Sequence, residues 1–397
     1  MEYSLFSRRN EAIDMLRGLT MLLMVFVNDF WTVGGVPHFL EHFAMLEDGM
    51  GVSDVVFPMF LFAMGMSVPY AIENRFAKGC SGESTLSHIL SRTLALLLMG
   101  AFTVNSEGGF SSVAGYGVNF YRIMMVMAFF LIWNSYPKEF RAKRWLQAAG
   151  LAILAFLALT FRTPEGGFFT AGWWGILGLI GWAYCFCAVT YLLCRRKPFR
   201  IAFVWLALCV ANLLLTQMRD GSYLIEGPSF IADMADALRL GNASSAIMAA
   251  GGMLFSLAEN RLSSRRCTVR IGCALAAAVI SALAAALFHH WWIISKLLGT
   301  LPWCLYVTSL SICLYLILRI LESYGKTGWF RPVKASGTAT LTVYMMPYVL
   351  YSILAVFGVY TIDWLTGALG LLKCALFSLL CTALAALAGR SGIKLKI

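Results

Sequence analysis

Long apolar stretches alternate with short polar connections along the whole chain. Twelve of these stretches centre on residues 15–33, 54–74, 88–106, 119–136, 145–162, 173–194, 200–217, 243–259, 271–290, 298–320, 338–358 and 365–389. Each comes near the roughly 20 residues that a helix needs to cross a hydrocarbon layer of about 30 Å. Several are only marginally long, so a count of eleven, with one segment re-entrant or on the membrane surface, stays open. The pattern predicts an all-α polytopic transmembrane bundle of 11–12 spans that forms a single domain over residues 1–397.

The composition supports a membrane protein. Hydrophobic residues make up 60% of the chain and charged residues 13%, and the mean hydropathy is +0.75. Such an apolar chain cannot be folded around one soluble core. The eleven cysteines fall mostly in the apolar stretches or at their cytoplasmic ends, so we interpret them as small core residues rather than a disulfide framework.

Basic residues are concentrated in every second connection between the apolar stretches. One such connection holds Arg75 and Lys78, and a later one holds the four arginines within 261–270, whereas the alternate connections are mostly acidic. Cytoplasmic loops of membrane proteins collect Lys and Arg. Twelve spans with both termini in the cytoplasm fit this alternation, and the loop that carries His42 then faces outward. Orientation signals account for most of the net charge of +11, so this charge does not indicate nucleic-acid binding.

The polar loop between the first two apolar stretches carries two histidines, His38 and His42. A single histidine in an exposed loop is more often inert than catalytic, but this loop is acidic and aromatic and lies at the mouth of a bundle. A neutral imidazole is the usual base for removing a proton from an amine or a hydroxyl, and either Asp54 or Glu41 is placed to orient His42. Asp54 follows Ser53 where the second stretch begins, so it is equally suited to cap free backbone N–H groups of the helix.

Polar residues inside an apolar span need either a partner or a task. Asp14 and Arg17 share one face of the first helix, which predicts an ion pair; the alternative is that Arg17 binds a phosphate of a cytoplasmic cofactor. Asn28 lies near the outer end of the same helix, where Asn28 and Asp29 either end the helix or act in the chemistry. The first helix therefore carries candidate groups at both ends.

Further polar groups fall at the outer level of the bundle: Asn105, Asn119, Arg122, His289, His290 and Lys296. Arg122 lies inside the fourth stretch and needs an anion, either Asp54 or a bound ligand. Adjacent residues of a helix point to different faces, so His289 and His290 make a poor metal site, and we expect no metal.

Two patterns concern the helices themselves. Glycines recur every three residues at positions 172, 175, 178 and 181, which is typical of close helix packing. The run ASGTATLTVYMMPY, residues 335–348, combines hydroxyl groups with Pro347 and predicts a kinked helix that lines a polar cavity, unless its hydroxyls bond within the helix. The chain has no phosphate-binding GxxxxGKS/T loop and no HExxH motif, so neither ATP-driven transport nor a metalloprotease is supported.

About sixty residues around the histidine-bearing loop contain a specific set of motifs. The set is Asp14-x-x-Arg17-Gly18, Met24-Val25-Phe26-Val27-Asn28, His42, and Asp54-x-x-Phe57-Pro58-x-Phe60-x-Phe62-x-Met64-Gly65-x-Ser67. It resembles the signature of heparan-alpha-glucosaminide N-acetyltransferase, the lysosomal transmembrane acetyltransferase, and of its bacterial relatives. Weaker similarity follows at Ser295-Lys296, Thr300 and Trp303, and from Gly337 to Tyr348. The segment from Asn28 to His42 differs in length from that of the lysosomal enzyme, which leaves His38 as a rival base.

The resemblance implies transfer of an acetyl group from cytoplasmic acetyl-CoA to an amino sugar on the far side of the membrane. It implies that His42 is the catalytic histidine, that Asn28 and Asp54 are its polar neighbours in catalysis, and that Lys296 belongs to a lysine motif. We further expect substrate contacts from Arg122, Lys296, His290 and His38, and contacts of Arg17 with the phosphates of CoA.

The predicted location is the bacterial inner membrane, with the active-site loop on the periplasmic side. The expected partners are acetyl-CoA, a sugar or glycan acceptor and the lipid bilayer, without nucleic acid; a homodimer is compatible with the sequence. The sequence leaves open whether transfer is direct or passes through an acetyl-histidine. It also leaves open an O-acetyltransferase of an envelope or dietary glycan, and a solute transporter, although no inverted repeat is evident.

Overall fold

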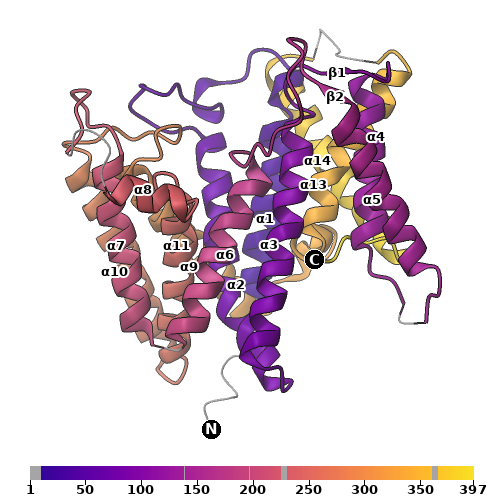
Figure 1. Cartoon of the computed structure of the whole chain (residues 1–397). Helices are drawn as coiled ribbons and strands as arrows, with labels where there is room; N and C mark the ends of the chain where they lie inside the picture. The colour runs from indigo at the N-terminus through magenta and orange to yellow at the C-terminus, as the bar shows by residue number, and fades with distance from the viewer. Residues whose placement is uncertain (1–9, 138, 196, 225–229, 360–364) are drawn as a thin grey trace. The chain divides into compact units, whose positions relative to one another are not determined.

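The computed structural model describes residues 10–137, 139–195, 197–224, 230–359 and 365–397, and this part of the chain is largely helical (Figure 1). Contacts between residues divide it into two compact units. Unit 1 comprises the described residues of 10–20, 37–90 and 182–331, and unit 2 those of 21–36, 91–181 and 332–397. Three helices, α1 (Glu11–Asn28), α3 (Gly82–Val104) and α6 (Ile176–Cys194), run from one unit into the other.

A helix overlaps each of the twelve apolar stretches. Seven helices of the described chain are long and apolar enough to cross a membrane: α2 (Val52–Ala77), α3, α6, α7 (Pro198–Leu215), α10 (Cys267–Phe288), α11 (Leu301–Ser323) and α14 (Gly367–Arg390). The remaining stretches form α1, α4 (Val118–Trp133), α5 (Lys143–Thr160), α9 (Ser244–Arg261) and α13 (Thr340–Val356). The all-α polytopic membrane class is confirmed, while the count of 11–12 spans and the single domain stay predictions.

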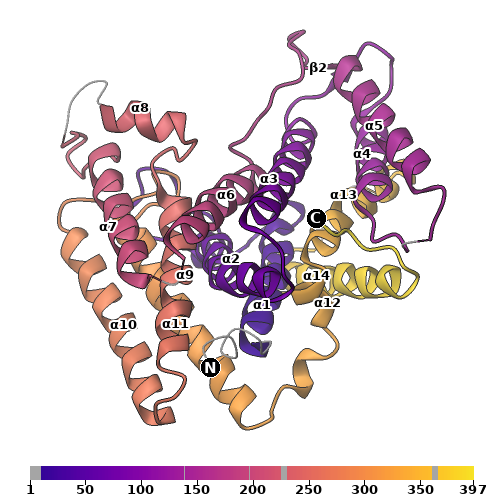
Figure 2. The same ribbon diagram turned by 60° about the horizontal axis from the view of Figure 1, so that its bottom comes forward.

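Unit 1 is built on the close contact of α2 with α9. A Cβ atom added to Gly65 would lie 1.8 Å from the carbonyl oxygen of Ala249, and one added to Gly252 would lie 2.0 Å from that of Phe62. The backbones of α2 and α9 are therefore in direct contact at these two glycines. α7 and α11 pack against α9, and α10 packs along α11 (Figures 1 and 2). The short α8 (Phe230–Ala237) packs on α7, and two 3₁₀ turns, η3 (His38–Leu40) and η4 (Gly328–Phe330), lie in connections.

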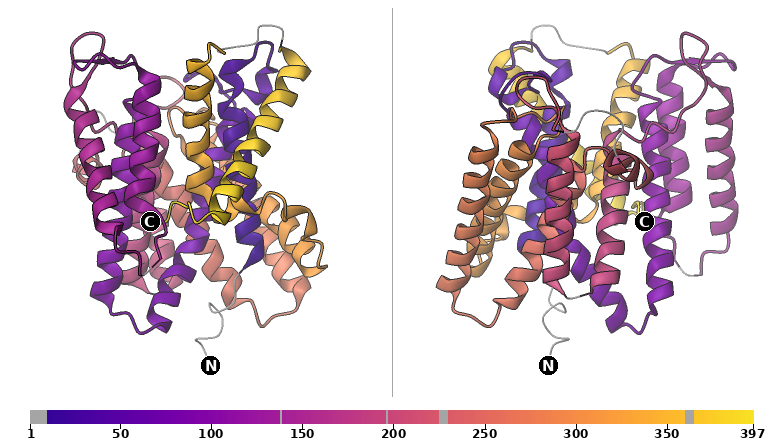
Figure 3. Two further views of the ribbon diagram at one scale, coloured as in Figure 1. Left: turned by 90° about the vertical axis from the view of Figure 1, so that its right-hand side faces the viewer. Right: turned by 60° about the vertical axis from the view of Figure 1, so that its left-hand side comes forward.

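Unit 2 packs α4 against α5, and α13 against both α4 and α14 (Figure 3). A short antiparallel pair of strands, β1 (Ser111–Ser112) and β2 (Phe161–Arg162), joins the ends of two connections, and η2 (Phe30–Thr32) contacts α14. In place of one kinked helix, the chain forms α12 (Lys334–Thr338) and α13. They are separated at Ala339, whose φ of −131° and ψ of 39° leave the helical region, while Pro347 lies inside α13.

The predicted glycine ridge at 172–181 is only partly a helix contact. α6 begins at Ile176, so Gly172, with φ of +52°, belongs to the preceding turn. Further along, a Cβ atom on Gly100 of α3 would lie 2.7 Å from the backbone nitrogen of Gly178. The close approach of α3 to α6 is thus confirmed at Gly178.

Candidate active site

In unit 1 the carboxylate at the start of α2 holds the imidazole of the preceding loop. His42 Nδ1 lies 2.7 Å from Asp54 Oδ1, while Oδ2 accepts the backbone N–H groups of Phe43 at 3.0 Å and Gly51 at 3.1 Å. Asp54 therefore both caps the helix and orients His42, a task that the sequence left open between Asp54 and Glu41. The side chain of Asp54 is 2% exposed and that of His42 is 49% exposed. Because a carboxylate only accepts hydrogen bonds, Nδ1 carries the hydrogen, and Nε2 keeps its lone pair.

Lys296, from the connection between α10 and α11, lies beside this pair. Its Nζ is 3.1 Å from His42 Nδ1, 3.8 Å from Asp54 Oδ1 and 3.5 Å from the carbonyl oxygen of Ser53. The single hydrogen on Nδ1 goes to the shorter contact, with the carboxylate, so Lys296 acts here as the counter-charge of Asp54. Burial lowers the pKa of Lys296 below its ordinary value, although Asp54 opposes this effect. Trp303 Nε1 donates to the carbonyl oxygen of Asp54 at 3.2 Å, which fixes the start of α2 from the α11 side.

His38, the rival base, faces another carboxylate. Its Nε2 lies 2.6 Å from Glu47 Oε1, and its ring stacks on Phe43 with 4.3 Å between centroids. The hydrogen bond from His38 holds the pKa of Glu47 below its ordinary value. In the described structure it is His42, rather than His38, that reaches Asp54.

The adjacent histidines after α10 point to different surroundings, as the sequence predicts. His289 Nε2 lies 2.8 Å from Asp48 Oδ1, and Asp48 also pairs with Arg219 at 2.8 Å. His290 is exposed, with its ring 6.0 Å from that of Trp291. A role of His290 in substrate binding stays a prediction.

Unit 2 contains a cavity of about 640 Å³. Its lining includes the polar residues Asn28, Asp29, Glu107 and Arg122 and the aromatic residues Trp31, Tyr344, Tyr348, Tyr351 and Phe377. Arg122 Nη2 donates to the carbonyl oxygen of Ser106 at 2.6 Å, and the Tyr348 hydroxyl donates to Glu107. Two carboxylates, those of Asp29 and Glu107, thus share this cavity with Arg122. A pairing of Arg122 with Asp54, which belongs to unit 1, stays a prediction. The prediction that this stretch lines a polar cavity is confirmed for Tyr344 and Tyr348 of α13. The alternative holds for Ser336 and Thr338, whose hydroxyls donate to the backbone carbonyls of Val333 and Lys334.

Asp29, which lines this cavity, belongs to an ion pair that the sequence pattern did not single out. Asp29, with a side chain 1% exposed, accepts from Lys373 Nζ at 2.8 Å and from the Tyr351 hydroxyl. Lys373 also donates to Tyr351 and Thr32, both at 2.7 Å. A signal was present: Lys373 is a charge within the apolar stretch 365–389, where it needs a partner. Tyr351 carried no such signal, because tyrosine is common near the ends of membrane helices.

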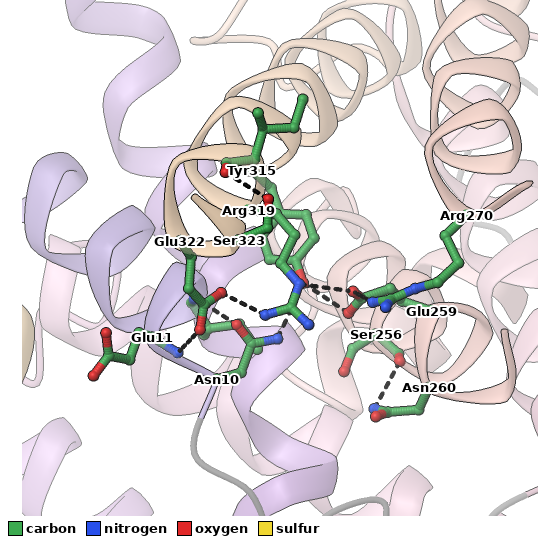
Figure 4. A network of polar contacts seen from close by, with 12 residues as sticks. Asn10, Glu11, Ser256, Glu259, Asn260, Arg270, Tyr315, Arg319, Glu322 and Ser323 are labelled. Atoms are coloured by element: carbon green, nitrogen blue, oxygen red, sulfur yellow. Dashed lines mark hydrogen bonds and ion pairs between the residues drawn. The ribbon is translucent and has the colours of Figure 1, made fainter. Parts of the chain in front are cut away.

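Two polar networks of unit 1 lie at the N-terminal end of α1, and both connect protein groups to one another. Arg17 forms the predicted ion pair with Asp14, 2.8 Å apart, and its contact with CoA stays a prediction. Nearby in the chain, Asn10 Nδ2 donates to Tyr315, which donates to Glu259 at 2.7 Å (Figure 4). Glu259 also forms an ion pair with Arg270 of α10. This network therefore joins Asn10, the residue before α1, to α9, α10 and α11.

A family model described as "Domain of unknown function (DUF5009)" matches residues 9–222, more than half of the 397 residues of the chain. The chain belongs to the DUF5009 family. The matched range includes His42, Asp54 and Arg122, whereas Lys296 lies beyond it.

This DUF5009 member is similar to two curated relatives over a quarter of its length. It is 35% identical over 99 residues to heparan-alpha-glucosaminide N-acetyltransferase of Mus musculus. The aligned residues make up 25% of this chain and 14% of the relative. It is 35% identical over 97 residues to the Homo sapiens protein of the same name, which is 24% of this chain and 14% of the relative. The resemblance drawn from the motifs is therefore confirmed, over a small part of each relative.

Proposed function

We propose that this DUF5009 protein is a membrane-embedded acetyltransferase that moves an acetyl group from cytoplasmic acetyl-CoA to an amino sugar on the outer side of the membrane. The observation that carries the proposal is the arrangement of His42, Asp54 and Lys296, in a chain similar to an N-acetyltransferase. A half-exposed imidazole on a buried carboxylate is suited to serve as a general base.

In the proposed reaction His42 Nε2 removes a proton from the acceptor amine as its nitrogen attacks the thioester carbonyl carbon. The new C–N bond forms, the C–S bond breaks, and the proton passes from the imidazolium to the departing CoA sulfur. Asp54 keeps the ring in the tautomer that leaves Nε2 unprotonated, and it stabilises the imidazolium between the two steps. The alternative route, through an acetyl-histidine, uses the same nitrogen as a nucleophile.

The donor and acceptor contacts are also part of this proposal. Arg17 is the proposed contact for a phosphate of CoA, because a guanidinium binds phosphate through paired N–H groups. The cavity of unit 2, taken by itself, has a volume within the range of small-molecule sites and an aromatic and polar lining. Asn28 is the proposed donor to the developing oxyanion.

Label transfer tests the proposal. Purified protein is supplied with acetyl-labelled acetyl-CoA and either glucosamine, its N-acetylated form or glucose. Label on the amine of glucosamine alone is the expected result. Label on glucose as well would move the function to O-acetylation of a glycan, and no consumption of acetyl-CoA with any acceptor would favour a transporter. Rapid quenching with donor alone distinguishes the two routes, since only the covalent one leaves acetyl on the protein.

A further inference from the structure

Three connecting segments of unit 1 meet at the carboxylate of Asp48. His289 Nε2 lies 2.8 Å from Oδ1, the backbone N–H of Ile294 donates to Oδ1 at 2.9 Å, and Arg219 Nη2 lies 2.8 Å from Oδ2. Arg219 is itself held to the same connection, since it donates to the carbonyl oxygens of Trp291 and His289. Asp48 thus accepts from the connections that follow α7 and α10.

The contact continues from Asp48 toward the candidate active site. The N–H of Gly49 donates to the carbonyl oxygen of Ile294 at 2.9 Å, and the Ser295 hydroxyl donates to that of Met45 at 2.8 Å. The next residue, Lys296, is the one that reaches back to His42. We name residues 37–51 the histidine loop and residues 289–300 the lysine loop. A row of hydrogen bonds joins the two loops. Asp48 lies at one end of this row and Lys296 at the other.

The histidine loop depends on such contacts for its position. Between Pro37 and Gly51 its regular structure, as described, is the single 3₁₀ turn η3. Contacts with other segments therefore fix its path, and those with Asp54 of α2 hold only the His42, Phe43 and Gly51 positions. The lysine loop precedes α11 and is anchored from the other side, where Asn212 Nδ2 donates to the carbonyl oxygen of Gly299 at 2.8 Å. The histidine loop, which has little regular structure, is therefore held in position by the anchored lysine loop.

We infer that Asp48 is a positioning residue: it fixes the register of the histidine loop against the lysine loop and so sets the distance of Lys296 from the His42–Asp54 pair. This inference rests on the proposed function only for its effect on acetyl transfer. Asp48 touches no reacting atom in this account. Its loss displaces the counter-charge of Asp54 and with it the environment of the base.

A direct test measures how fast Lys296 reacts with a small amine-directed reagent. Full-length protein is labelled briefly with acetic anhydride, and modification of each lysine is read by peptide mass spectrometry, with exposed Lys78 as the internal reference. In Asp48→Ala, Lys296 is expected to be labelled several-fold faster than in the parent, because its contacts with His42 and Asp54 loosen. The matched control is Asp220→Ala, which removes an exposed carboxylate next to Arg219 that bonds Ser222.

Turnover provides the second readout. A displacement of about 1 Å in a reacting group is enough to cost up to about 100-fold in rate, so kcat is expected to fall at least about tenfold in Asp48→Ala with the KM for acetyl-CoA little changed. Asp48→Asn keeps an oxygen for the N–H of Ile294 and is expected to recover much of the loss. A purely structural defect would lower the amount of folded protein, and thermal unfolding of each variant separates that case.

The outcomes distinguish this inference from the proposed function. Unchanged labelling of Lys296 in Asp48→Ala, relative to Asp220→Ala, overturns the positioning role whether or not the protein transfers acetyl groups. Faster labelling in a protein that shows no transfer with any acceptor upholds the register and overturns the function. If Asp48→Ala does not fold, the same measurement on His289→Ala and Arg219→Ala, each of which removes one side-chain donor to Asp48, decides the matter.

Discussion

The tautomer of one imidazole depends on a single buried oxygen. Asp54 Oδ1 holds His42 Nδ1, while Oδ2 is occupied by backbone N–H groups, so the carboxylate cannot rotate away without leaving those donors unsatisfied. Capping of α2 and orientation of His42, which the sequence offered as alternative roles of Asp54, are therefore performed by the two oxygens of one carboxylate.

Replacement of Asp54 by Asn keeps the size of the side chain but removes the charge and turns one acceptor into a donor. We expect kcat for acetyl transfer to fall by about 10²- to 10⁴-fold, the range that a general base contributes. Glu41→Gln, in the same loop, is the matched control and is expected to stay near the parent rate. Steady-state rates with both variants check this, and equal losses in the two would remove Asp54 from the orienting role.

The contacts of Asp48 should make the free energy of unfolding depend on pH. Partial burial raises its pKa, but the N–H of Ile294 together with His289 and Arg219 outweighs this and holds the pKa of Asp48 below its ordinary value. A carboxylate with a lowered pKa contributes stability that is present above the ordinary value, about 3.9, and is lost as the pH falls through the lowered one. The thermal midpoint of the parent should therefore exceed that of Asp48→Asn near neutral pH, and the difference should shrink in strong acid. The same difference at both extremes would contradict this account.

The residues of the site were predictable to different degrees. His42 and Asp54 are twelve positions apart and belong to one motif, so the sequence brought them together. The contact between Lys373 and Asp29 joins residues 344 positions apart, and that of His289 with Asp48 spans 241. No local pattern encodes such pairs, because they form only when distant helices pack.

At the scale of elements, the length and apolarity of each stretch predicted the helices, since a membrane span must satisfy its backbone hydrogen bonds internally. The break at Ala339 was not predictable, because the residue is neither Gly nor Pro. The tightest helix contact was also missed. The periodic glycines at 172–181 formed a visible pattern. Gly65 on α2 and Gly252 on α9 belong to no such period, and their role is evident only from the backbone that each one faces.

Gly65→Ala tests that contact. The new methyl group would overlap the carbonyl of Ala249, and forcing extra volume into a packed contact costs about 1–3 kcal/mol, so the midpoint of thermal unfolding should drop. Gly272→Ala is the control: a Cβ there meets nothing within 4 Å, and alanine favours a helix by about 0.5–1 kcal/mol over glycine. A Gly65→Ala protein as stable as Gly272→Ala would show that α2 and α9 do not approach so closely.

At the scale of the whole molecule, the alternation of basic and acidic connections predicts an orientation. A fluorescent reporter that matures only in the cytoplasm should be bright when fused after Ile397. A phosphatase that is active only outside the cytoplasm should be active when fused after Met45, in the histidine loop. The reverse pair of results would place His42 on the side of the acetyl-CoA pool, and transfer across the membrane would no longer be needed.

In the proposed reaction His42 is the base for acetyl transfer. The most direct measurement compares the parent with His42→Ala in label transfer from acetyl-CoA to glucosamine, with His38→Ala as the matched control. We expect transfer in the parent and in His38→Ala, and loss of transfer in a folded His42→Ala protein. Transfer that survives in His42→Ala but fails in His38→Ala would contradict it and assign the base to the other histidine of the loop.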